Sequence, residues 1–313
     1  MHHLFLGISP ASLVHAPYTP AVSERLVLNA GDYGLAVQER AELIMLSDIA
    51  GYVGADTCGC LLAIRQDQQE EISLMIDIGT NGEMVLGNRE RMVTCSTAAG
   101  PAFEGAKIEC GMRGAAGAVD HVKYEDGKWN YTTVGNKPAV GLCGSGLIDL
   151  VAGLLDAGML DENGVLRSGQ EKQGVFILVL PERGGNERGV YLTQKDLGEV
   201  QLAKAAIAAG IQMLMERLGI TEDDICSVYI AGAFGNYMDP VSAGKIGLFP
   251  ATLVKKVKPV GNAAGEGAKI ALVNEKEMLE MDELVRKIEF VELAASADFQ
   301  DHFIDELGFE TGE

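Results

Sequence analysis

Short apolar runs separated by glycine-containing turns dominate the chain from residue 72 onward. ISLMIDIG, EMVLGN and RMVTCSTA are three such runs. Each is short, rich in apolar and β-branched residues, and bounded by a tight turn, so together they predict an antiparallel meander of three strands. The glycine-rich stretch at 98–120 carries little strand or helix signal. We expect it to be an ordered excursion that carries functional loops.

Helical patterns follow this excursion. GLCGSGLIDLVAGLLDAGML has leucines at helical spacing directly after a glycine loop. A longer helix is predicted from Thr193 and Asp196, which have capping-box spacing, to a stop at Gly219. SVYIAGAFG predicts a buried strand, and Asp239-Pro240 predicts the start of a short helix.

The last third of the chain repeats a strand, glycine loop and helix layout. VKPVGNAAGEGAKIALVN has this layout, and KIEFVELA predicts a late strand before a terminal helix. The order of elements over 72–275 matches the ribonuclease-H-like unit that is duplicated in actin-type ATPases, an α/β fold. LIMLSDIAGYVGADTCGCLLAI, nearer the start, has the same layout. We therefore expect 1–71 to be the closing part of a first lobe, and 72–313 to be a complete second lobe with a glycine-rich insertion.

Composition places the chain among ordinary globular proteins. It has 313 residues, of which 47% are hydrophobic, and contains no run of about 20 apolar residues that could span a membrane. The formal net charge of −20 repels nucleic acid and anionic lipid, so neither is expected as a partner. The six cysteines show no C-x-x-C pairing of a zinc site or close run of an iron–sulfur ferredoxin, which favours reduced thiols in a cytoplasmic protein.

The turn in MIDIGTNGE has a chemical interpretation of its own. A strand that ends in Asp77 is followed by Gly79, Thr80, Asn81 and Gly82, which places backbone N–H groups and two short polar side chains at one turn. Such a turn could cradle a phosphate, with Asp77 holding Mg²⁺ through water. Glu83 could orient a water molecule or close the loop. The alternative is a tight hairpin whose glycines only satisfy the turn geometry.

Three other loops are candidates for the same site. Gly144, Ser145 and Gly146 open a helix whose positive dipole end favours an anion, or they serve only as a helix cap. Gly232 and Gly235 follow a buried strand, as close approach to a purine ring requires, or they allow tight packing. The loop at 261–267 more often would be a packing turn. All these loops lie at one edge of the predicted sheet, where ligands of open α/β sheets collect.

Charged residues also interrupt the glycine-rich excursion. They could line a cleft or simply be solvated, and the sequence leaves both interpretations open. They are Glu104, Lys107, Glu109 and Arg113.

Five segments, in order, resemble one known family. IDIGTNGE, the block at 97–120, GLCGSGLIDLVA, YIAGAFGNYMD and GNAAGEGAKIAL are similar to the C-terminal ATPase part of the reductive activators of corrinoid proteins. MHHLFLGISPASL and ERAELIMLSDIAGYVGADT resemble the segment just upstream in that family. The resemblance covers nearly the whole chain. It implies membership of the superfamily of acetate and sugar kinases, heat-shock chaperones and actin.

The resemblance implies a function as well. Members of the family use ATP to drive a low-potential electron onto a cobalt(II) corrinoid, which restores cobalt(I) in a partner corrinoid protein. Carried over by position, Asp77 to Glu83 would form a phosphate loop, with Asp77 and Glu83 catalytic and Asp77 holding Mg²⁺. Gly144 to Gly146 would be a second phosphate contact. The adenosine loop would be Gly232, Ala233, Phe234 and Gly235.

Two family features lie outside this sequence. The cluster-binding cysteines of the [2Fe-2S] ferredoxin-like domain and an earlier D-x-G-T-T phosphate loop belong to upstream segments, so Met1 corresponds to an internal position of the family. Two rival functions stay open. One is a docking domain without catalytic activity, and the other is a small-molecule kinase, for which the sequence shows no base or substrate pocket. A homodimer would fit the family.

Overall fold

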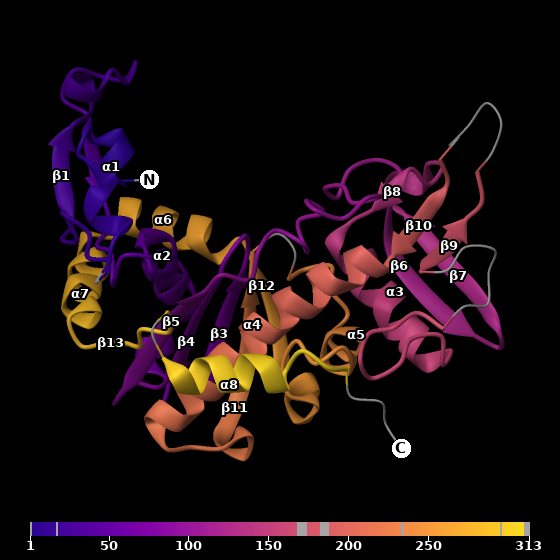
Figure 1. The fold of residues 1–313 in the computed structure, drawn as a ribbon. Coiled ribbons are helices and arrows are strands. Elements are labelled where there is room, and N and C mark those ends of the chain that lie inside the picture. The colour runs from indigo at the N-terminus through magenta and orange to yellow at the C-terminus, as the bar shows by residue number, and fades with distance from the viewer. Residues whose placement is uncertain are drawn as a thin grey trace.

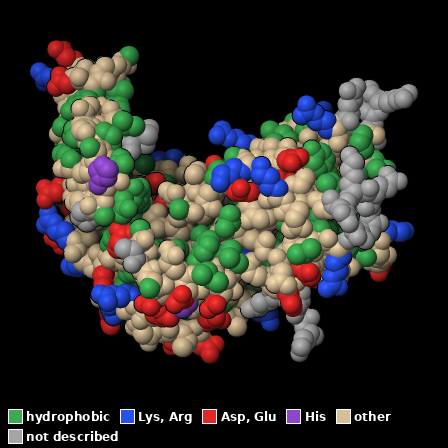
Figure 2. Space-filling view, in the orientation of Figure 1, with side chains coloured by type: hydrophobic (Ala, Val, Ile, Leu, Met, Phe, Trp, Pro, Cys, Tyr) green, Lys and Arg blue, Asp and Glu red, His purple; other side chains and the backbone are tan. Residues whose placement is uncertain are grey.

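The computed structural model describes residues 2–16, 18–167, 174–181, 188–232, 235–294 and 296–309. A central sheet covered by helices lies between a small N-terminal part and a distal subdomain, which is formed by the described residues of 118–193 (Figure 1). The surface is hollowed between these two flanking parts, and Lys and Arg side chains gather on the side of the hollow nearer the distal subdomain (Figure 2). In the described part of the chain, no helix is both long and apolar enough to cross a membrane.

The central sheet has six strands in the order β12-β11-β3-β4-β5-β13. Strands β3 (Ile72–Ile78), β4 (Gly82–Gly87) and β5 (Met92–Thr97) are antiparallel neighbours, as the apolar pattern predicts. Strand β11 (Ile225–Ala231) pairs in parallel with β3, and β12 (Val257–Gly261) pairs in parallel with β11. The short strand β13 (Glu289–Phe290) pairs with β5. This order confirms the predicted ribonuclease-H-like arrangement.

Helices cover both faces of the sheet. Because side chains alternate along a strand, Leu74 and Ile76 pack into the core under α4 (Gln194–Leu218), whereas Met75 packs toward α2 (Ala55–Ile64). Helices α6 (Ala263–Val273) and α7 (Glu275–Val285) complete the α2 face (Figure 1). Each face of β3 therefore contacts a different part of the chain.

Helix α4 begins and ends where the sequence predicts. Thr193 caps its first turn in a reciprocal capping box with Asp196, and Gly219 ends it in a left-handed conformation. Lys204 is buried near its middle and donates a hydrogen bond to the Gly308 carbonyl. This contact fixes the segment after α8 (Ala297–Asp305) against α4.

The distal subdomain contains strands that the sequence did not predict. Strands β6 (Ala118–Glu125) and β7 (Lys128–Thr133) form a hairpin beside β8 (Gly141–Leu142), and α3 (Gly144–Asp156) packs on β6. A second hairpin joins β9 (Val175–Val179) to β10 (Val190–Thr193). The turn at 126–127 has positive φ at both residues, 51° and 76°, as an Asp-Gly hairpin turn requires.

The N-terminal part adds a small hairpin and a tightly packed helix. Strands β1 (Leu26–Asn29) and β2 (Glu42–Met45) pair with each other, apart from the central sheet, and α1 (His2–Phe5) precedes them. Helix α2 follows a glycine-bearing loop, as predicted. It packs against α6 so closely that a Cβ added to Gly267 would lie 1.8 Å from the Gly59 carbonyl oxygen.

The remaining elements are short. Helix α5 (Pro240–Lys245) begins at the predicted Asp239-Pro240, with Asp239 as its N-cap. The 3₁₀ helices are Pro10–Leu13, Ala30–Tyr33, Gln66–Gln68, Val134–Asn136, Glu222–Asp224 and Ala251–Lys256.

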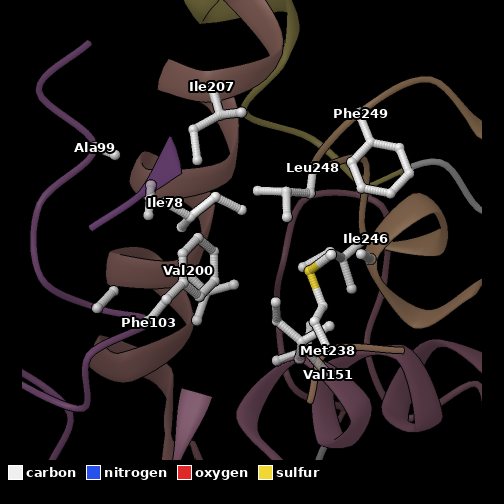
Figure 3. Packing of buried hydrophobic residues seen from close by; sticks show 14 of the residues in the cluster. Ile78, Ala99, Phe103, Val151, Val200, Ile207, Met238, Ile246, Leu248 and Phe249 are labelled. Atoms are coloured by element: carbon white, nitrogen blue, oxygen red, sulfur yellow. The ribbon is translucent and has the colours of Figure 1, made fainter. Parts of the chain in front are cut away.

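One buried cluster of apolar side chains joins the central sheet to the distal subdomain. It brings Ile78 at the end of β3 together with Phe103 of the glycine-rich excursion and Val200 of α4, and continues to Val151 of α3 (Figure 3). The turn after Ile78 is therefore mounted on the main core.

Candidate functional site

The predicted phosphate turn is a three-residue connection between β3 and β4. Ile78 pairs with Gly82 across the two strands, and the Gly79 amide donates to the Asn81 carbonyl oxygen at 2.9 Å. Gly82 lies against α4, because an added Cβ would be 3.1 Å from Ile207. Thr80 is exposed at the tip. The hairpin interpretation and the ligand interpretation are thus both compatible with this geometry.

Two carboxyl groups lie side by side at the base of this turn. Asp77 and Glu83 are directly opposite each other on β3 and β4. Desolvation by burial, reinforced by the charge of Asp56, raises the pKa of Asp77 above its ordinary value. Desolvation likewise raises the pKa of Glu83 to about 7, although its hydrogen bond from the Ser96 hydroxyl, 3.0 Å long, acts in the opposite direction. Because like charges on paired strands repel, this arrangement favours a bound cation.

Acidic residues from the N-terminal part face the same turn. A cavity of about 330 Å³ is lined by Asn81 and Glu83 on one side and by Asp48, Asp56 and His2 on the other. The His2 Nδ1 atom lies 3.1 Å from an Asp48 carboxylate oxygen. Sequence reasoning missed these three N-terminal residues. A signal did exist, because Asp48 follows a strand and Asp56 opens a helix after a glycine, in the layout that singled out the later loops.

The donor set of this cavity suits a hard cation with phosphate ligands. Mg²⁺ prefers carboxylate and water oxygens and is commonly held by one or two carboxylates together with substrate phosphates. Glu83 lines the cavity, and Asp77 lies directly opposite Glu83 on the neighbouring strand. Within the described residues, however, no three His, Cys, Asp or Glu side chains are already arranged as a complete metal site. The remaining ligands would therefore come from water and from the phosphates, and Asp77 as a metal ligand stays a prediction.

The predicted adenosine loop begins directly beside Asp77. Gly232 follows β11, has a φ of +90°, and a Cβ at this position would lie 3.1 Å from an Asp77 carboxylate oxygen. Its amide donates to the Gly261 carbonyl at 2.9 Å, which brings two of the predicted glycine loops together. A Cβ on Gly235 would collide with the Ile230 backbone at 2.7 Å, so packing explains that glycine. Residues 233 and 234 of the predicted loop lie outside the described residues.

The Gly144–Gly146 segment lies in the distal subdomain. All three residues are buried at the start of α3. The Ser145 hydroxyl donates to the Asp120 carbonyl at 2.8 Å, and a Cβ on Gly146 would lie 2.2 Å from the Val119 carbonyl oxygen. These contacts are with β6 and its flank rather than with the β3–β4 turn. Packing accounts for Ser145 and Gly146, and their role as a second phosphate contact stays a prediction.

The sheet is six-stranded and ribonuclease-H-like, with a pair of carboxyl groups on β3 and β4 and a glycine loop directly after β11, and these features define a class. The protein has the actin-type ATPase fold. Residues 71–313 match the family model described as the C-terminal domain of RACo, the ASKHA domain, and residues 1–69 match the RACo middle region. The chain belongs to the family of reductive activators of corrinoid proteins.

Individual relatives support this assignment. The chain is 35% identical to the corrinoid activation enzyme RamQ of Eubacterium limosum, over 97% of this chain and 54% of that protein. It is 29% identical to the [Co(II) methylated amine-specific corrinoid protein] reductase of Methanosarcina barkeri, over 89% of this chain and 54% of that protein. The solved structure of a reductive activator for corrinoid, iron-sulfur protein matches with a TM-score of 0.91 and 38% identity, over 99% of this chain and 51% of the other. The chain thus spans about half the length of the relatives it matches.

Proposed function

We propose that this chain is the ATPase and corrinoid-protein-docking portion of a reductive activator, which uses ATP to help return cobalt(II) to cobalt(I) in a partner corrinoid protein. The observation that carries the proposal is the pair of half-buried carboxyl groups, Asp77 and Glu83, at a glycine turn that opens into a cavity. The family membership supports it, because relatives of the chain are named for corrinoid activation or corrinoid reduction.

The chain's own residues would divide the work at the turn as follows. Asp77 and Glu83 would hold Mg²⁺ directly or through water, and the Thr80 hydroxyl with the backbone amides of Thr80 and Asn81 would hold phosphoryl oxygens. Gly232 leaves room beside Asp77 for the nucleotide to approach the backbone. Bound Mg·ATP supplies the free energy of phosphoryl transfer to water. A conformational bias results if these residues contact the γ-phosphate of ATP and lose that contact in ADP.

The proposal extends to the parts of the chain and to its partners. Residues 1–71 would be the closing part of a first lobe, and 72–313 a complete second lobe. The cavity between Glu83 and Asp48 would then be the seam between the two lobes. A corrinoid protein, an upstream [2Fe-2S] ferredoxin-like domain, a homodimer and a cytoplasmic location remain predictions that follow from the family.

Calorimetric titration with Mg·ATP tests the site. We compare the wild-type chain with Asp77→Asn, which keeps the shape and removes the charge. The control is Asp223→Asn, the same change at an exposed position before the amino end of β11, away from the turn. If Asp77 helps to hold the metal, Asp77→Asn weakens binding at least about tenfold, or about 1.4 kcal/mol, and Asp223→Asn does not.

Equal or tighter binding by Asp77→Asn would contradict the site, since that carboxylate would then only repel the phosphates. A wild-type chain that binds no nucleotide but still binds a corrinoid protein would instead support the docking-domain alternative. Hydrolysis of ATP without any added acceptor would argue against the kinase alternative.

A further inference from the structure

Glu104, in the glycine-rich excursion, contacts the tip of the β3–β4 turn. The Thr80 hydroxyl donates a hydrogen bond of 3.0 Å to the Glu104 Oε1 atom. The same oxygen would lie 3.7 Å from a Cβ placed on Gly79. Both Glu104 and Thr80 are exposed to solvent. An acidic side chain thus lies over the turn that the proposed function assigns to a phosphate.

The backbone that carries Glu104 is held firmly. Within this tight turn the Glu104 amide donates to the Pro101 carbonyl, and neighbouring Phe103 is only 4% exposed in the core cluster that includes Ile78 (Figure 3). Gly105 has a φ of +79°, and a Cβ there would lie 2.5 Å from the Met112 amide nitrogen. The excursion is therefore fixed on the same core as the turn, so Glu104 can leave Thr80 mainly by rotating its side chain.

A phosphoryl group at the turn would compete directly with Glu104. The Thr80 hydroxyl has a single proton to donate, and the oxygens of an ionised carboxylate and the unprotonated oxygens of a phosphoryl group compete to accept it. Two anions that share this donor at hydrogen-bond distance also repel each other. The contact is then made in the ligand-free protein and lost when the turn is filled.

We propose that Glu104 is a specificity-determining residue of the phosphate turn. Its carboxylate occupies the Thr80 hydroxyl until a phosphoryl oxygen replaces it, and its charge disfavours phosphates that arrive without a bound cation. Mg·ATP, whose metal offsets part of the negative charge, is accepted, whereas inorganic phosphate alone is rejected. This inference rests on the proposed function, because it requires that the turn receives phosphate at all.

Substitution of Glu104 by glutamine gives a clean test, because the amide oxygen can still accept from Thr80 while the charge is lost. The matched control is Glu109→Gln, since Glu109 is exposed on the same excursion but its carboxylate accepts from the Tyr191 hydroxyl instead. We titrate wild type and both variants with Mg·ATP and with inorganic phosphate by calorimetry, at low and high ionic strength.

The expected result is that Glu104→Gln binds Mg·ATP about tenfold more tightly than wild type at low salt, and that the gain shrinks as salt screens the charge. The gain should be larger for inorganic phosphate, and Glu109→Gln should match wild type. A role of Glu104 in folding alone would not produce this salt dependence.

Two outcomes would overturn the inference, and they differ in what they say about the site. If wild type and Glu104→Gln bind Mg·ATP equally, Glu104 does not control the turn, but the proposed nucleotide site stands. If neither protein nor the control binds nucleotide under any condition, the proposed nucleotide site and the inference fail together.

Discussion

The contact between α2 and α6 allows a sharp prediction about how the N-terminal part is held to the sheet. In the substitution Gly267→Ala, the new methyl group would lie 1.8 Å from the Gly59 carbonyl oxygen, 2.4 Å from its carbonyl carbon and 2.5 Å from its Cα atom. All three are backbone atoms, so no side chain can rotate away. To reach an ordinary contact of 3.4 Å, the two helices must separate by about 1.6 Å at this point.

The expected cost follows from two opposing effects. Alanine is favoured over glycine within a helix by about 1 kcal/mol. Overpacking of a buried contact typically costs about 1 to 3 kcal/mol, and a collision with three backbone atoms belongs at the upper end of that range. The net effect on the free energy of unfolding is therefore a loss of about 2 kcal/mol.

Urea unfolding followed by far-ultraviolet circular dichroism measures this loss, and amide hydrogen exchange over 55–64 locates it. The control is Gly198→Ala in α4, where an added Cβ would meet nothing within 4 Å. That variant should gain about 0.5 to 1 kcal/mol. If Gly267→Ala is stabilised as much as Gly198→Ala, with unchanged exchange in α2, the close helix contact does not exist in solution.

Two further predictions concern carboxyl groups, one half-buried and one fully buried. Desolvation raises the pKa of Glu83 in the folded protein to about 7, from an ordinary 4.5. Between these two values the folded state keeps a proton that the unfolded state releases. The free energy of unfolding of the wild type therefore falls as the pH rises from 4.5 to about 7. Glu83→Gln should match wild type near pH 5 and be more stable at pH 8 in urea unfolding, whereas a constant difference across pH would contradict the burial argument. Asp196 is fully buried and accepts from the amides of Glu109 and Thr193 at 2.9 Å, so Asp196→Ala should cost about 2 to 4 kcal/mol. Asp224 forms the same kind of reciprocal capping box with Thr221, but at an exposed position. Asp224→Ala should therefore cost clearly less, and equal losses would show that burial of the Thr193–Asp196 capping box is irrelevant.

Local sequence patterns predicted the elements whose signals are themselves local. The meander of β3, β4 and β5 follows from short apolar runs between turns, and the ends of α4 follow from Thr193, Asp196 and Gly219. Strands β6 and β7 were missed because their residues are mostly polar and half of them face solvent. Only the Asp126-Gly127 turn marked that hairpin.

The candidate site was predictable on one side only. Asp77 and Glu83 are six residues apart in one hairpin, so the sequence alone places them together. Asp48 and Asp56 reach the same cavity because α2 packs on α6, more than 200 residues further along the chain. No periodic pattern of hydrophobic residues within either helix predicts the contact between α2 and α6. The Thr80–Glu104 hydrogen bond was hidden for the same reason, since the path of the glycine-rich excursion depends on where Phe103 is buried.

The β3–β4 turn touches both flanks of the molecule at once. Glu83 faces the cavity lined by the N-terminal part, while the Thr80 hydroxyl donates a hydrogen bond to Glu104 in the excursion that leads into the distal subdomain. If the turn binds phosphate as proposed, the phosphate would therefore lie beside contacts to both flanks. Loss of one phosphate from the turn would then change the surroundings of Glu83 on one flank and of Thr80 on the other through the same three-residue connection.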